Sequence, residues 1–520
     1  MNKGLNLLVR NVIPNWVSNL STPRFNRSHS MPHTTASTTT AATTVASVNQ
    51  VTKSTTRKRS SSTSPSATKL TTRLKNSGYF KESEAIKKLS NIVLTSEQIE
   101  LKETLLQFIR DNLESYNSGI DEDKPSVFII NGDAGTGKSV ILNSIFNEIQ
   151  KISKNCPSSQ TKNLILKNTK NYLVVNHPEM LKLYHQTSKK YSYILKSDLE
   201  RPTSLINKYA NSDTKIDVLI IDEAHLLATS KDAFKRFHQE NHLQELLKIS
   251  KVVIMVFDEN QSLRMGSYWK LDQIQNTEGS RMESDGASLS KFLSSEHISK
   301  FQFHQLQRQF RVTANEHILN WIKEISTHKN LSPLLPIHND PVFQLRFFDN
   351  CQTMYQMIKF QNSQVGQSRI LSTYDFPYRL DGNDYFVYSQ TDSFKLRWDR
   401  YLPSITTPWS ERQDTIDEVG SVYTIQGFDL NFAGVILGRS IGWDHEGQCL
   451  KIKPEYYDDH AGFTKKKNIN NVDKVKEKIV LNSLNVLLTR GVKGLYIYAW
   501  DKELREILLS SVSEDFVIRD

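Results

Sequence analysis

The sequence FIINGDAGTGKSVILNSI, residues 128–145, decides the fold of this chain. It contains the pattern G-x-x-x-x-G-K-S, in which Gly132 and Gly137 leave room for backbone N–H groups to surround a phosphate chain. An apolar run typical of a buried strand precedes the pattern, and an apolar run at helical spacing follows it. Because a helix N-terminus is electropositive, a strand, a glycine-rich loop and a helix in this order predict a phosphate-binding loop.

The chemistry of this loop assigns roles to its residues. The Lys138 side chain is expected to reach the β and γ phosphates of ATP, and the Ser139 hydroxyl is expected to hold Mg²⁺. The residues of the loop expected to contact ATP are Gly132, Ala134, Gly135, Thr136, Gly137, Lys138 and Ser139. A glycine-rich turn that merely joins a strand to a helix is the structural alternative.

Composition limits the class of protein. The chain has 520 residues, of which 38% are hydrophobic and 23% are charged, and this length is enough for about three domains. No run of about eighteen apolar residues occurs, so no membrane span is expected. The three cysteines, Cys156, Cys351 and Cys449, lie far apart and form neither a metal-binding nor a disulfide pattern, which favours a reducing compartment.

The net charge of +10 comes from the N-terminal part of the chain. The first acidic residue is Glu82, and residues 1–81 contain 12 Lys and Arg, so the remainder has 54 basic residues (66 − 12) against 56 acidic ones. The chain from Glu82 onward is therefore close to neutral, and its overall charge gives no argument for nucleic-acid binding.

Residues 1–80 are expected to form a disordered, basic leader that is rich in Ser and Thr. Its first residues are amphipathic at helical spacing and free of acids, which is the profile of a mitochondrial transit peptide. The basic run RKR, residues 57–59, would instead suit a nuclear signal or a solvated charge cluster. Mitochondrial localisation is the preferred interpretation, and nuclear or cytosolic localisation is the alternative.

Short apolar strands alternate with helical patterns from Val127 onward. The expected strands are SVFII, NYLVV, DVLII, KVVIMVF, SRILSTY, GVILG and GLYIYAW. This alternation predicts an α/β fold with mostly parallel sheets. Two groups of strands, in residues 81–300 and 301–515, are expected to form two domains.

Acidic side chains follow the strand in IDVLIIDEAHLL, residues 216–227. Open α/β sheets place their ligands at the carboxyl ends of parallel strands. Asp222 is therefore expected to hold Mg²⁺, directly or through water, and Glu223 to orient and deprotonate the attacking water. A helix N-cap formed by Asp222, with Glu223 favoured by the helix dipole, is the structural alternative.

Two further polar segments are candidates for the same site. In KVVIMVFDENQSLR, residues 251–264, Gln261 follows a strand and could sense the γ-phosphate or position water, although a simple turn uses the same residue types. In LTSEQIELKETLLQFI, residues 94–109, Thr95 and Gln98 fit a capping box at the start of a helix. The functional alternative for Gln98 is recognition of adenine by its amide.

Taken in order, these segments resemble superfamily-one helicases, and among them the Schlafen group 3-like DNA/RNA helicase domain family. The segments that carry the resemblance are GDAGTGKS, YLVVNHPEMLKLY, IDEAH, FDENQSLR, LQRQFR, SVYTIQGFDLNFAGVILG and NVLLTRGVKGLYIY. The resemblance covers residues 90–505, approximately. The last two segments are the most specific, because P-loop proteins in general do not require them.

The resemblance implies two RecA-like P-loop domains with ATP in the cleft between them. The first domain would carry Gln98, Lys138, Ser139, Asp222, Glu223 and Gln261. The second would supply Arg311 and Arg490, which would stabilise the charge that develops on the γ-phosphoryl group in the transition state. From the residues alone, Arg311 is equally a surface charge on a helix, and Arg490 is equally a cap at a strand end.

The segment TIQGFDL is implied by the resemblance to couple ATP to a nucleic-acid strand through Thr424, Gln426 and Gly427. From the residues alone it is a glycine turn between two strands. The sequence as a whole thus favours a Mg²⁺-dependent ATP hydrolase of the superfamily-one helicase type, acting on single-stranded DNA or RNA. An ATP-driven switch with a protein partner and no unwinding activity is the alternative.

Overall fold

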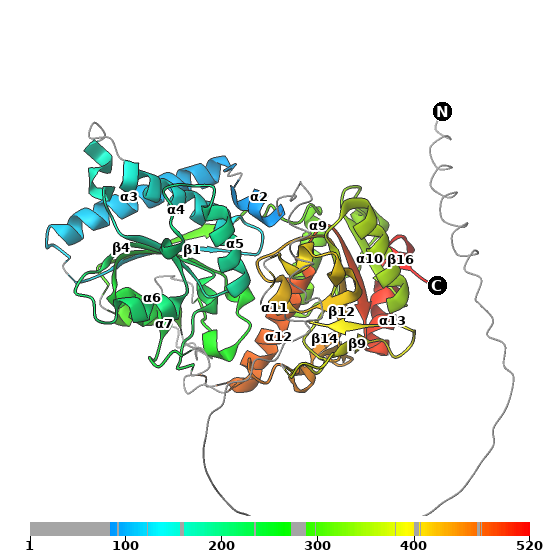
Figure 1. Cartoon of the computed structure of the whole chain (residues 1–520). Helices are drawn as coiled ribbons and strands as arrows, with labels where there is room; N and C mark the ends of the chain where they lie inside the picture. Colours follow the sequence, from blue (N-terminus) through cyan, green and yellow to red (C-terminus); the bar gives the residue numbers. More distant parts are fainter. Residues whose placement is uncertain are drawn as a thin grey trace, which may run out of the picture. The chain divides into compact units, whose positions relative to one another are not determined.

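Two sheets, each mostly parallel and each covered by helices, organise the chain (Figure 1). The computed structural model describes residues 84–90, 93–121, 123–155, 161–232, 236–271, 288–296, 298–379, 381–399, 405, 407–464, 469 and 471–520. Residues 80–520 form one compact unit. The expected leader lies outside the described residues, and so do the transit-peptide and nuclear-signal hypotheses that concern it.

The first sheet has six strands among the described residues, all parallel, in the order β3-β2-β4-β5-β1-β6. Their bounds are β1 (Ser126–Gly132), β2 (Asn171–Val175), β3 (Leu199–Glu200), β4 (Ile216–Asp222), β5 (Ser250–Phe257) and β6 (Lys300–Leu306). The central strands are buried on both faces, which explains why their sequences are continuous apolar runs.

The second sheet has eight strands within the part of the chain that the structure describes, in the order β16-β7-β15-β12-β8-β11-β10-β9. Only the β9–β10 pair is antiparallel among these pairings. The strands are β7 (Gln344–Phe348), β8 (Ser368–Ser372), β9 (Phe386–Tyr388), β10 (Lys395–Trp398), β11 (Glu418–Gly420), β12 (Leu430–Leu437), β15 (Gly491–Ala499) and β16 (Val517–Ile518). A separate antiparallel hairpin is formed by β13 (Ile441–Asp444) and β14 (Cys449–Ile452).

Helices cover both faces of the first sheet (Figure 1). One face packs against α3 (Ser96–Asn117), α4 (Lys138–Asn155) and α5 (Pro178–Ser188), and the other packs against α6 (Pro202–Tyr209), α7 (His242–Lys248) and α8 (Leu289–Ser295). Successive strand residues point to opposite faces, so Phe128 and Ile130 join the first layer while Val127 and Ile129 join the second. The predicted α/β fold with mostly parallel sheets is confirmed.

The second sheet is also covered on both faces. One face packs against α10 (Cys351–Val365), and the other packs against α12 (Val472–Leu488) and α13 (Lys502–Ser511). The remaining helices are α2 (Glu84–Ser90), α9 (Glu316–Lys323) and α11 (Val422–Ile425). Along β12, Ala433 and Val435 belong to the α12 layer, while Phe432 and Ile436 belong to the α10 layer. No helix among the described residues is long and apolar enough to span a bilayer.

The first sheet extends beyond the boundary that was expected at residue 300. Its edge strand β6 begins at Lys300 and pairs with β1 as far as Leu306. The sequence of β6, KFQFHQL, is more polar than that of the central strands, and most of its side chains are exposed or half-buried at the edge of the sheet that the structure describes. A strand of this composition carries no continuous apolar run.

Candidate nucleotide-binding site

The phosphate-binding loop joins β1 to α4 as the sequence predicts. Gly132 is the last residue of β1 and Lys138 is the first of α4. Gly135 and Gly137 have φ values of +87° and +82°, a region in which a side chain is strained. A Cβ on Gly137 would lie 2.3 Å from Nε2 of Gln98, so this position also lacks space for any larger residue.

Lys138 is buried and points back into the loop. Its Nζ donates to the carbonyl oxygens of Gly132 (2.5 Å) and Asp133 (2.8 Å), and it forms an ion pair with Oδ2 of Asp258 at 3.0 Å. The Asp258 carboxylate thus neutralises the lysine charge inside the site. A phosphate group that binds in the loop must compete with Asp258 for this ammonium group.

Asp222 lies at the carboxyl end of β4, opposite the start of α4. Its Oδ1 accepts a hydrogen bond from Ser139 Oγ at 3.3 Å, and its Oδ2 accepts one from the buried Tyr184 hydroxyl at 2.7 Å. Asp222 has no exposed surface. Burial, followed by repulsion from Glu223, raises the pKa of the Asp222 carboxyl group to about 6.

Glu223 has a different environment from its neighbour. Its backbone adopts a left-handed conformation (φ 52°, ψ 49°), which turns the side chain away from the strand direction. Its Oε2 lies 2.9 Å from Nε2 of the fully buried His225. Burial alone would raise the pKa of Glu223, but His225, followed by Lys138 and His177, outweighs burial and lowers it, so Glu223 is held ionised.

Gln261 connects the two sides of the site. It ends the single turn η5 (Glu259–Gln261) that follows β5. Its Nε2 donates to Oδ2 of Asp258 at 2.5 Å, and its Oε1 accepts from Nη2 of Arg490 at 3.4 Å. Lys138, Asp258, Gln261 and Arg490 therefore form a continuous chain of polar contacts from the phosphate-binding loop to the second sheet.

Arg490 lies between α12 and β15 and is fully buried. Its guanidinium group donates to the carbonyl oxygens of Val486 (2.8 Å) and Phe428 (3.3 Å) as well as to Gln261. Burial, followed by repulsion from Arg311, lowers the pKa of Arg490 to about 9, which leaves it protonated at neutral pH. The side chain is a buried cation that lines the cavity, and its bonds to two backbone carbonyls just before β15 are also compatible with a cap at the strand end.

Arg311 lies in the loop between β6 and α9, so it is not a charge on a helix surface. Its Nε forms an ion pair with Oδ1 of Asp429 at 2.6 Å. The preceding residue, Phe310, donates its backbone N–H to the carbonyl of Gly135 at 2.8 Å. This loop therefore rests directly on the phosphate-binding loop.

A cavity of about 810 Å³ contains most of the predicted site residues. Those that line it are Gln98, Gly135, Gly137, Lys138, Ser139, Glu223, Gln261, Arg311, Gly427 and Arg490. Its size is within the range of small-molecule sites in proteins. The lining also includes residues of α2 together with Thr95 and Glu411.

The other predicted residues lie around this cavity without lining it. Gly132, Ala134 and Thr136 support the loop, and Asp222 lies behind Ser139. Gln426 donates from Nε2 to the carbonyl of Gln261 at 3.2 Å, and this nitrogen also lies 3.3 Å from His225 Nε2.

Thr424 is directed elsewhere, because its hydroxyl donates to the carbonyl of Ser421 at 2.8 Å. The segment around it is more than a glycine turn, since the single-turn helix α11 precedes Gly427.

The Gln98 amide is occupied by protein contacts. Its Oε1 accepts from the Thr95 backbone N–H at 3.1 Å, which completes the predicted capping box of α3. Its Nε2 donates to the carbonyl of Thr136 at 3.3 Å. The structural interpretation of Gln98 is therefore confirmed, and its contact with Thr136 additionally braces the phosphate-binding loop.

The donor set fits a nucleotide with Mg²⁺ better than a metal held by protein alone. Among the residues that the structure describes, no group of three or more His, Cys, Asp and Glu side chains is placed to hold a metal. Asp222 and Ser139 converge at one point, and Mg²⁺ typically combines one or two carboxylates with phosphate oxygens and water.

Sequence reasoning missed three residues of the site. Tyr184 and His225 orient the two carboxylates, and Asp429 pairs with Arg311. His225 and Asp429 stand inside the quoted motifs, so their position was a signal that could have been used. Tyr184, on α5, likewise ends the quoted segment YLVVNHPEMLKLY, and its burial against Asp222 gives it its place in the site.

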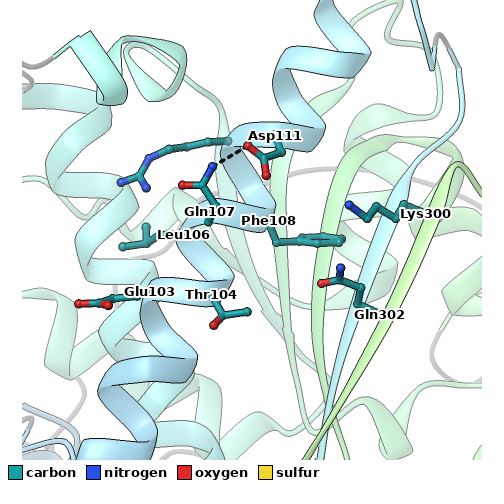
Figure 2. A pocket seen from close by; sticks show the side chains of 9 residues that line it. Glu103, Thr104, Leu106, Gln107, Phe108, Asp111, Lys300 and Gln302 are labelled. Atoms are coloured by element: carbon teal, nitrogen blue, oxygen red, sulfur yellow. Dashed lines mark hydrogen bonds between the residues drawn. The ribbon is translucent and has the colours of Figure 1, made fainter.

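A second cavity, of about 590 Å³, lies between α3 and β6 and shares no lining residue with the first (Figure 2). Phe108 extends from α3 toward Lys300 and Gln302 on β6, and Lys300 Nζ lies 6.0 Å from its ring centre. Gln107 is hydrogen-bonded to Asp111 at 2.6 Å along α3. None of the predicted site residues lies here.

Comparisons with known proteins give a family and a relative. The family model described as Schlafen group 3, DNA/RNA helicase domain, matches residues 125–501. The Saccharomyces cerevisiae protein described as "Uncharacterized protein YPL245W" is 56% identical over 436 residues, which are 82% of this chain and 92% of the relative.

Similar solved structures are more distant. The Pif1 helicase from Candida albicans is 12% identical, with 78% of this chain and 95% of that chain covered and a TM-score of 0.28. A complex of arterivirus nonstructural protein 10 (helicase) with DNA is also 12% identical, with 75% of this chain and 62% of that chain covered and a TM-score of 0.27. Similarity at this level carries no argument about the chemistry of the site.

Proposed function

Because this chain belongs to the Schlafen group 3 DNA/RNA helicase domain family, we propose that it is a Mg²⁺-dependent ATP hydrolase of the superfamily-one helicase type, acting on single-stranded DNA or RNA. Family membership confirms the resemblance expected from the seven segments, and a P-loop protein of helicase kind follows from it. Beyond family membership, we propose three properties: turnover of ATP, dependence on Mg²⁺, and action on a nucleic acid. The division into two RecA-like domains, one for each sheet, is part of the same proposal.

One observation carries the proposal. The same cavity is lined by the phosphate-binding loop of the first sheet and by Arg311 and Arg490, which belong to the elements around the second sheet. Arginines delivered from an opposing domain stabilise charge on the γ-phosphoryl oxygens, and this effect requires a site that both halves complete. A glycine-rich turn without a ligand would not require a buried arginine and a second, partly exposed arginine beside it.

The residues of the cavity divide the chemistry among themselves. Ser139 and Asp222 would hold Mg²⁺, which when bound neutralises charge on the phosphate oxygens. Lys138 binds the β and γ phosphates once it leaves Asp258. Glu223, already ionised, orients the attacking water and takes its proton. Gln261 contacts the γ-phosphate, and Arg311 and Arg490 stabilise the transition state.

Asp258 is the anionic partner of Lys138 in the site. Its carboxylate forms an ion pair with the buried lysine, which keeps this cation from standing unpaired. Binding of a triphosphate exchanges one anion for another at Lys138. The released carboxylate remains hydrogen-bonded to Gln261, so phosphate binding is transmitted toward Arg490 through contacts already present.

The decisive experiment measures ATP turnover of the full chain with and without single-stranded DNA or RNA. Wild-type protein is expected to hydrolyse ATP when Mg²⁺ is present, and nucleic acid is expected to increase the rate. Lys138→Ala should abolish turnover because it removes the phosphate-binding charge. Since it also removes the ion-pair partner of Asp258, the circular dichroism spectrum is recorded to establish that the variant is folded. Unchanged turnover in this variant would refute the assignment of the loop.

An ATP-driven switch with a protein partner is the second candidate. The near-neutral charge of the chain from Glu82 onward favours it, because strand-binding proteins usually present a basic surface. The same turnover experiment separates the two functions. Turnover that no DNA or RNA stimulates, at any salt concentration, would favour the switch.

A further inference from the structure

Helix α12 of the second sheet docks on the turn that carries Gln261. This turn, η5, leaves the first sheet at the end of β5, whereas α12 runs beside β12 and ends two residues before Arg490. The two elements are separated by more than two hundred residues in the sequence but share several direct contacts. Their junction lies beside the cavity that contains Gln261 and Arg490.

Asn482 forms the centre of this junction. It stands in the middle of α12, and only 1% of its surface is exposed. Its amide nitrogen donates one hydrogen bond to the carbonyl of Glu259 at 3.0 Å and another to the carbonyl of Ser262 at 2.9 Å. These carbonyls flank Gln261 on both sides, so one amide group fixes the whole turn. An aspartate of the same shape could donate neither bond.

Further contacts hold the junction in place. Lys478 Nζ, one turn earlier on α12, donates to Oδ1 of Asn260 at 3.0 Å. Met265, just beyond the turn, donates its backbone N–H to the carbonyl of Gly462 at 2.9 Å. Its side chain belongs to an apolar cluster whose other buried members, Ile469, Val475 and Ile479, come from the second half of the chain. The contact is thus polar at the turn and apolar beyond it.

Gln261 is held from both halves of the chain. On the side of its own sheet, its backbone N–H donates to the Asp258 carbonyl at 3.2 Å and its Nε2 donates to the Asp258 carboxylate at 2.5 Å. From the second half, Asn482 binds the backbone before and after this glutamine, Gln426 binds its carbonyl, and Arg490 binds its side-chain oxygen. Arg490 is itself fixed to α12, because its Nε donates to Val486 of that helix at 2.8 Å. Asn482 and Arg490 therefore belong to one rigid segment, and the position of Gln261 relative to Arg490 is set within it.

We propose that Asn482 is a positioning residue for ATP hydrolysis, which fixes the Gln261 turn to α12 so that Gln261 and Arg490 reach the γ-phosphate together. This inference rests on the proposed function of the cavity. According to this inference, the contact between η5 and α12 stays intact when the cleft opens and closes, and the movement takes place at other contacts between the two halves. Asn482 itself does not contact the substrate. Its loss is therefore expected to change the position of Gln261 relative to Arg490 and to leave the phosphate-binding loop intact.

The test compares two identical substitutions on one helix. Asn482→Asp keeps the shape of the side chain and replaces both N–H donors by an oxygen that faces two carbonyls. Asn485→Asp is the matched control, because Asn485 lies three residues further on α12 and accepts from Ser326 Oγ at 3.3 Å through an oxygen that aspartate retains. Both full-chain variants are measured for kcat with MgATP and for the Kd of a non-hydrolysable ATP analogue.

Asn482→Asp is expected to lower kcat by roughly 10- to 100-fold, the effect of a small misplacement of transition-state groups. The Kd of the analogue is expected to stay within about threefold of wild type, and Asn485→Asp to leave both quantities within about threefold. If Asn482→Asp does not fold, Asn482→Ser, which keeps one donor, should show a smaller loss of kcat with the same unchanged Kd. Equal losses in kcat and affinity, or equal effects of the 482 and 485 variants, would overturn the proposal.

A measurement independent of activity separates this inference from the proposed function. Hydrogen exchange of the nucleotide-free protein should be faster for backbone amides of residues 258–268 in Asn482→Asp than in wild type or Asn485→Asp. If hydrogen exchange of residues 258–268 is the same in Asn482→Asp as in wild type, the proposed role of Asn482 is wrong, even if the protein hydrolyses ATP. Conversely, a wild-type chain without ATP turnover would refute the proposed function while the exchange result still reports on the contact between η5 and α12.

Discussion

At the scale of single residues, the two adjacent carboxyl groups of the site ionise differently because their surroundings differ. Asp222 is buried next to another carboxylate, which raises its pKa, whereas Glu223 faces His225 and has its pKa lowered. Surroundings that make the pKa values of two neighbouring acids differ are typical of sites in which the two acids have different roles, here cation binding and proton acceptance. The arrangement agrees with the division of roles proposed above.

The first prediction concerns the stability of the nucleotide-free protein as a function of pH. Because the folded-state pKa of Asp222 is raised from 3.8 to about 6, its stabilising contribution is present below pH 3.8 and is lost as the pH rises through 6. Asp222→Asn should therefore gain in Tm relative to wild type as the pH is raised from 5 to 8, although its turnover is lost.

Glu223→Gln supplies the contrast for this measurement. The pKa of Glu223 is lowered in the folded state, so its charge stabilises the fold at neutral pH, although the substitution also removes repulsion on Asp222. The variant should therefore gain clearly less in Tm between pH 5 and 8 than Asp222→Asn. The same pH trend in both variants would contradict the assignment of the two environments.

A second prediction at this scale concerns Glu223 as the base. Glu223→Gln keeps the shape of the side chain but removes its ability to accept a proton. Turnover should fall by roughly 10²- to 10⁴-fold while the ATP analogue still binds, because general-base effects act on the chemical step. Single-turnover kinetics measure the two quantities separately. High residual turnover combined with a collapse of nucleotide affinity would show that Glu223 is not the base.

At the scale of elements, helix α3 supports the site through its first turn. Thr95 and Gln98 form a reciprocal capping box, and Gln98 also binds Thr136 of the phosphate-binding loop. The N-terminus of one helix thereby braces the loop that begins another. The cap has a structural role in α3 and an indirect role in shaping the loop.

Thr95→Ala should lower the free energy of unfolding by about 1 kcal/mol, since it removes an N-cap hydrogen bond. Thr104→Ala is the matched control on the same helix, because the Thr104 hydroxyl only donates to the carbonyl of Glu100 at an exposed position. This control should change stability by less than about 0.5 kcal/mol. Urea denaturation of both variants checks the difference, and equal effects would mean that the cap contributes nothing to α3.

At the scale of the whole molecule, the two sheets supply different parts of one cavity. The first sheet provides the phosphate-binding loop and the two acids, and the elements around the second provide the two arginines. Each arginine already has a carbonyl, amide or carboxylate partner, so the cations are stabilised before a nucleotide binds. When such a site closes on a nucleotide, the two arginines exchange their protein partners for phosphate oxygens, and no further charged side chain has to be buried.

Arg490→Ala should lower kcat by roughly 10²- to 10³-fold and change ATP-analogue affinity far less, because its main contact is expected in the transition state. Arg505→Ala is the control for loss of a buried arginine. Arg505 is 7% exposed and binds the Tyr498 hydroxyl at 3.1 Å and the carbonyl of Ala499 at 2.6 Å, away from the cavity. Equal losses of binding and turnover in Arg490→Ala would contradict the helicase-type mechanism.

The leader has a prediction of its own. Residues 1–80 fused to a fluorescent protein should direct it to mitochondria if the amphipathic, acid-free start of the chain is a transit peptide. Confocal imaging with a mitochondrial marker provides the measurement, and a fusion in which the first 20 residues are removed is the control. A nuclear signal would favour the RKR run instead, and a diffuse signal would exclude targeting by this segment.

The sequence by itself determined the features that depend on neighbouring residues. The strand, loop and helix of the phosphate-binding motif, the seven apolar strands and the capping box of α3 all form where expected, because side-chain periodicity and local hydrogen bonds specify them. The sequence does not predict β6 and β7, because their polar residues, as in KFQFHQL and QLRFF, interrupt the apolar run by which the other strands are identified.

Only the tertiary structure decided which distant groups meet. A chain of contacts runs from Lys138 through Asp258 and Gln261 to Arg490. Its last two residues, Gln261 and Arg490, are 229 positions apart in the sequence. Likewise, Asp429 as the partner of Arg311 and Asn482 as the support of the Gln261 turn follow from the packing of one half on the other. The physical reason is that burial makes each polar group require a partner, and which partner is within reach depends on how helices and sheets pack, which local sequence patterns do not encode.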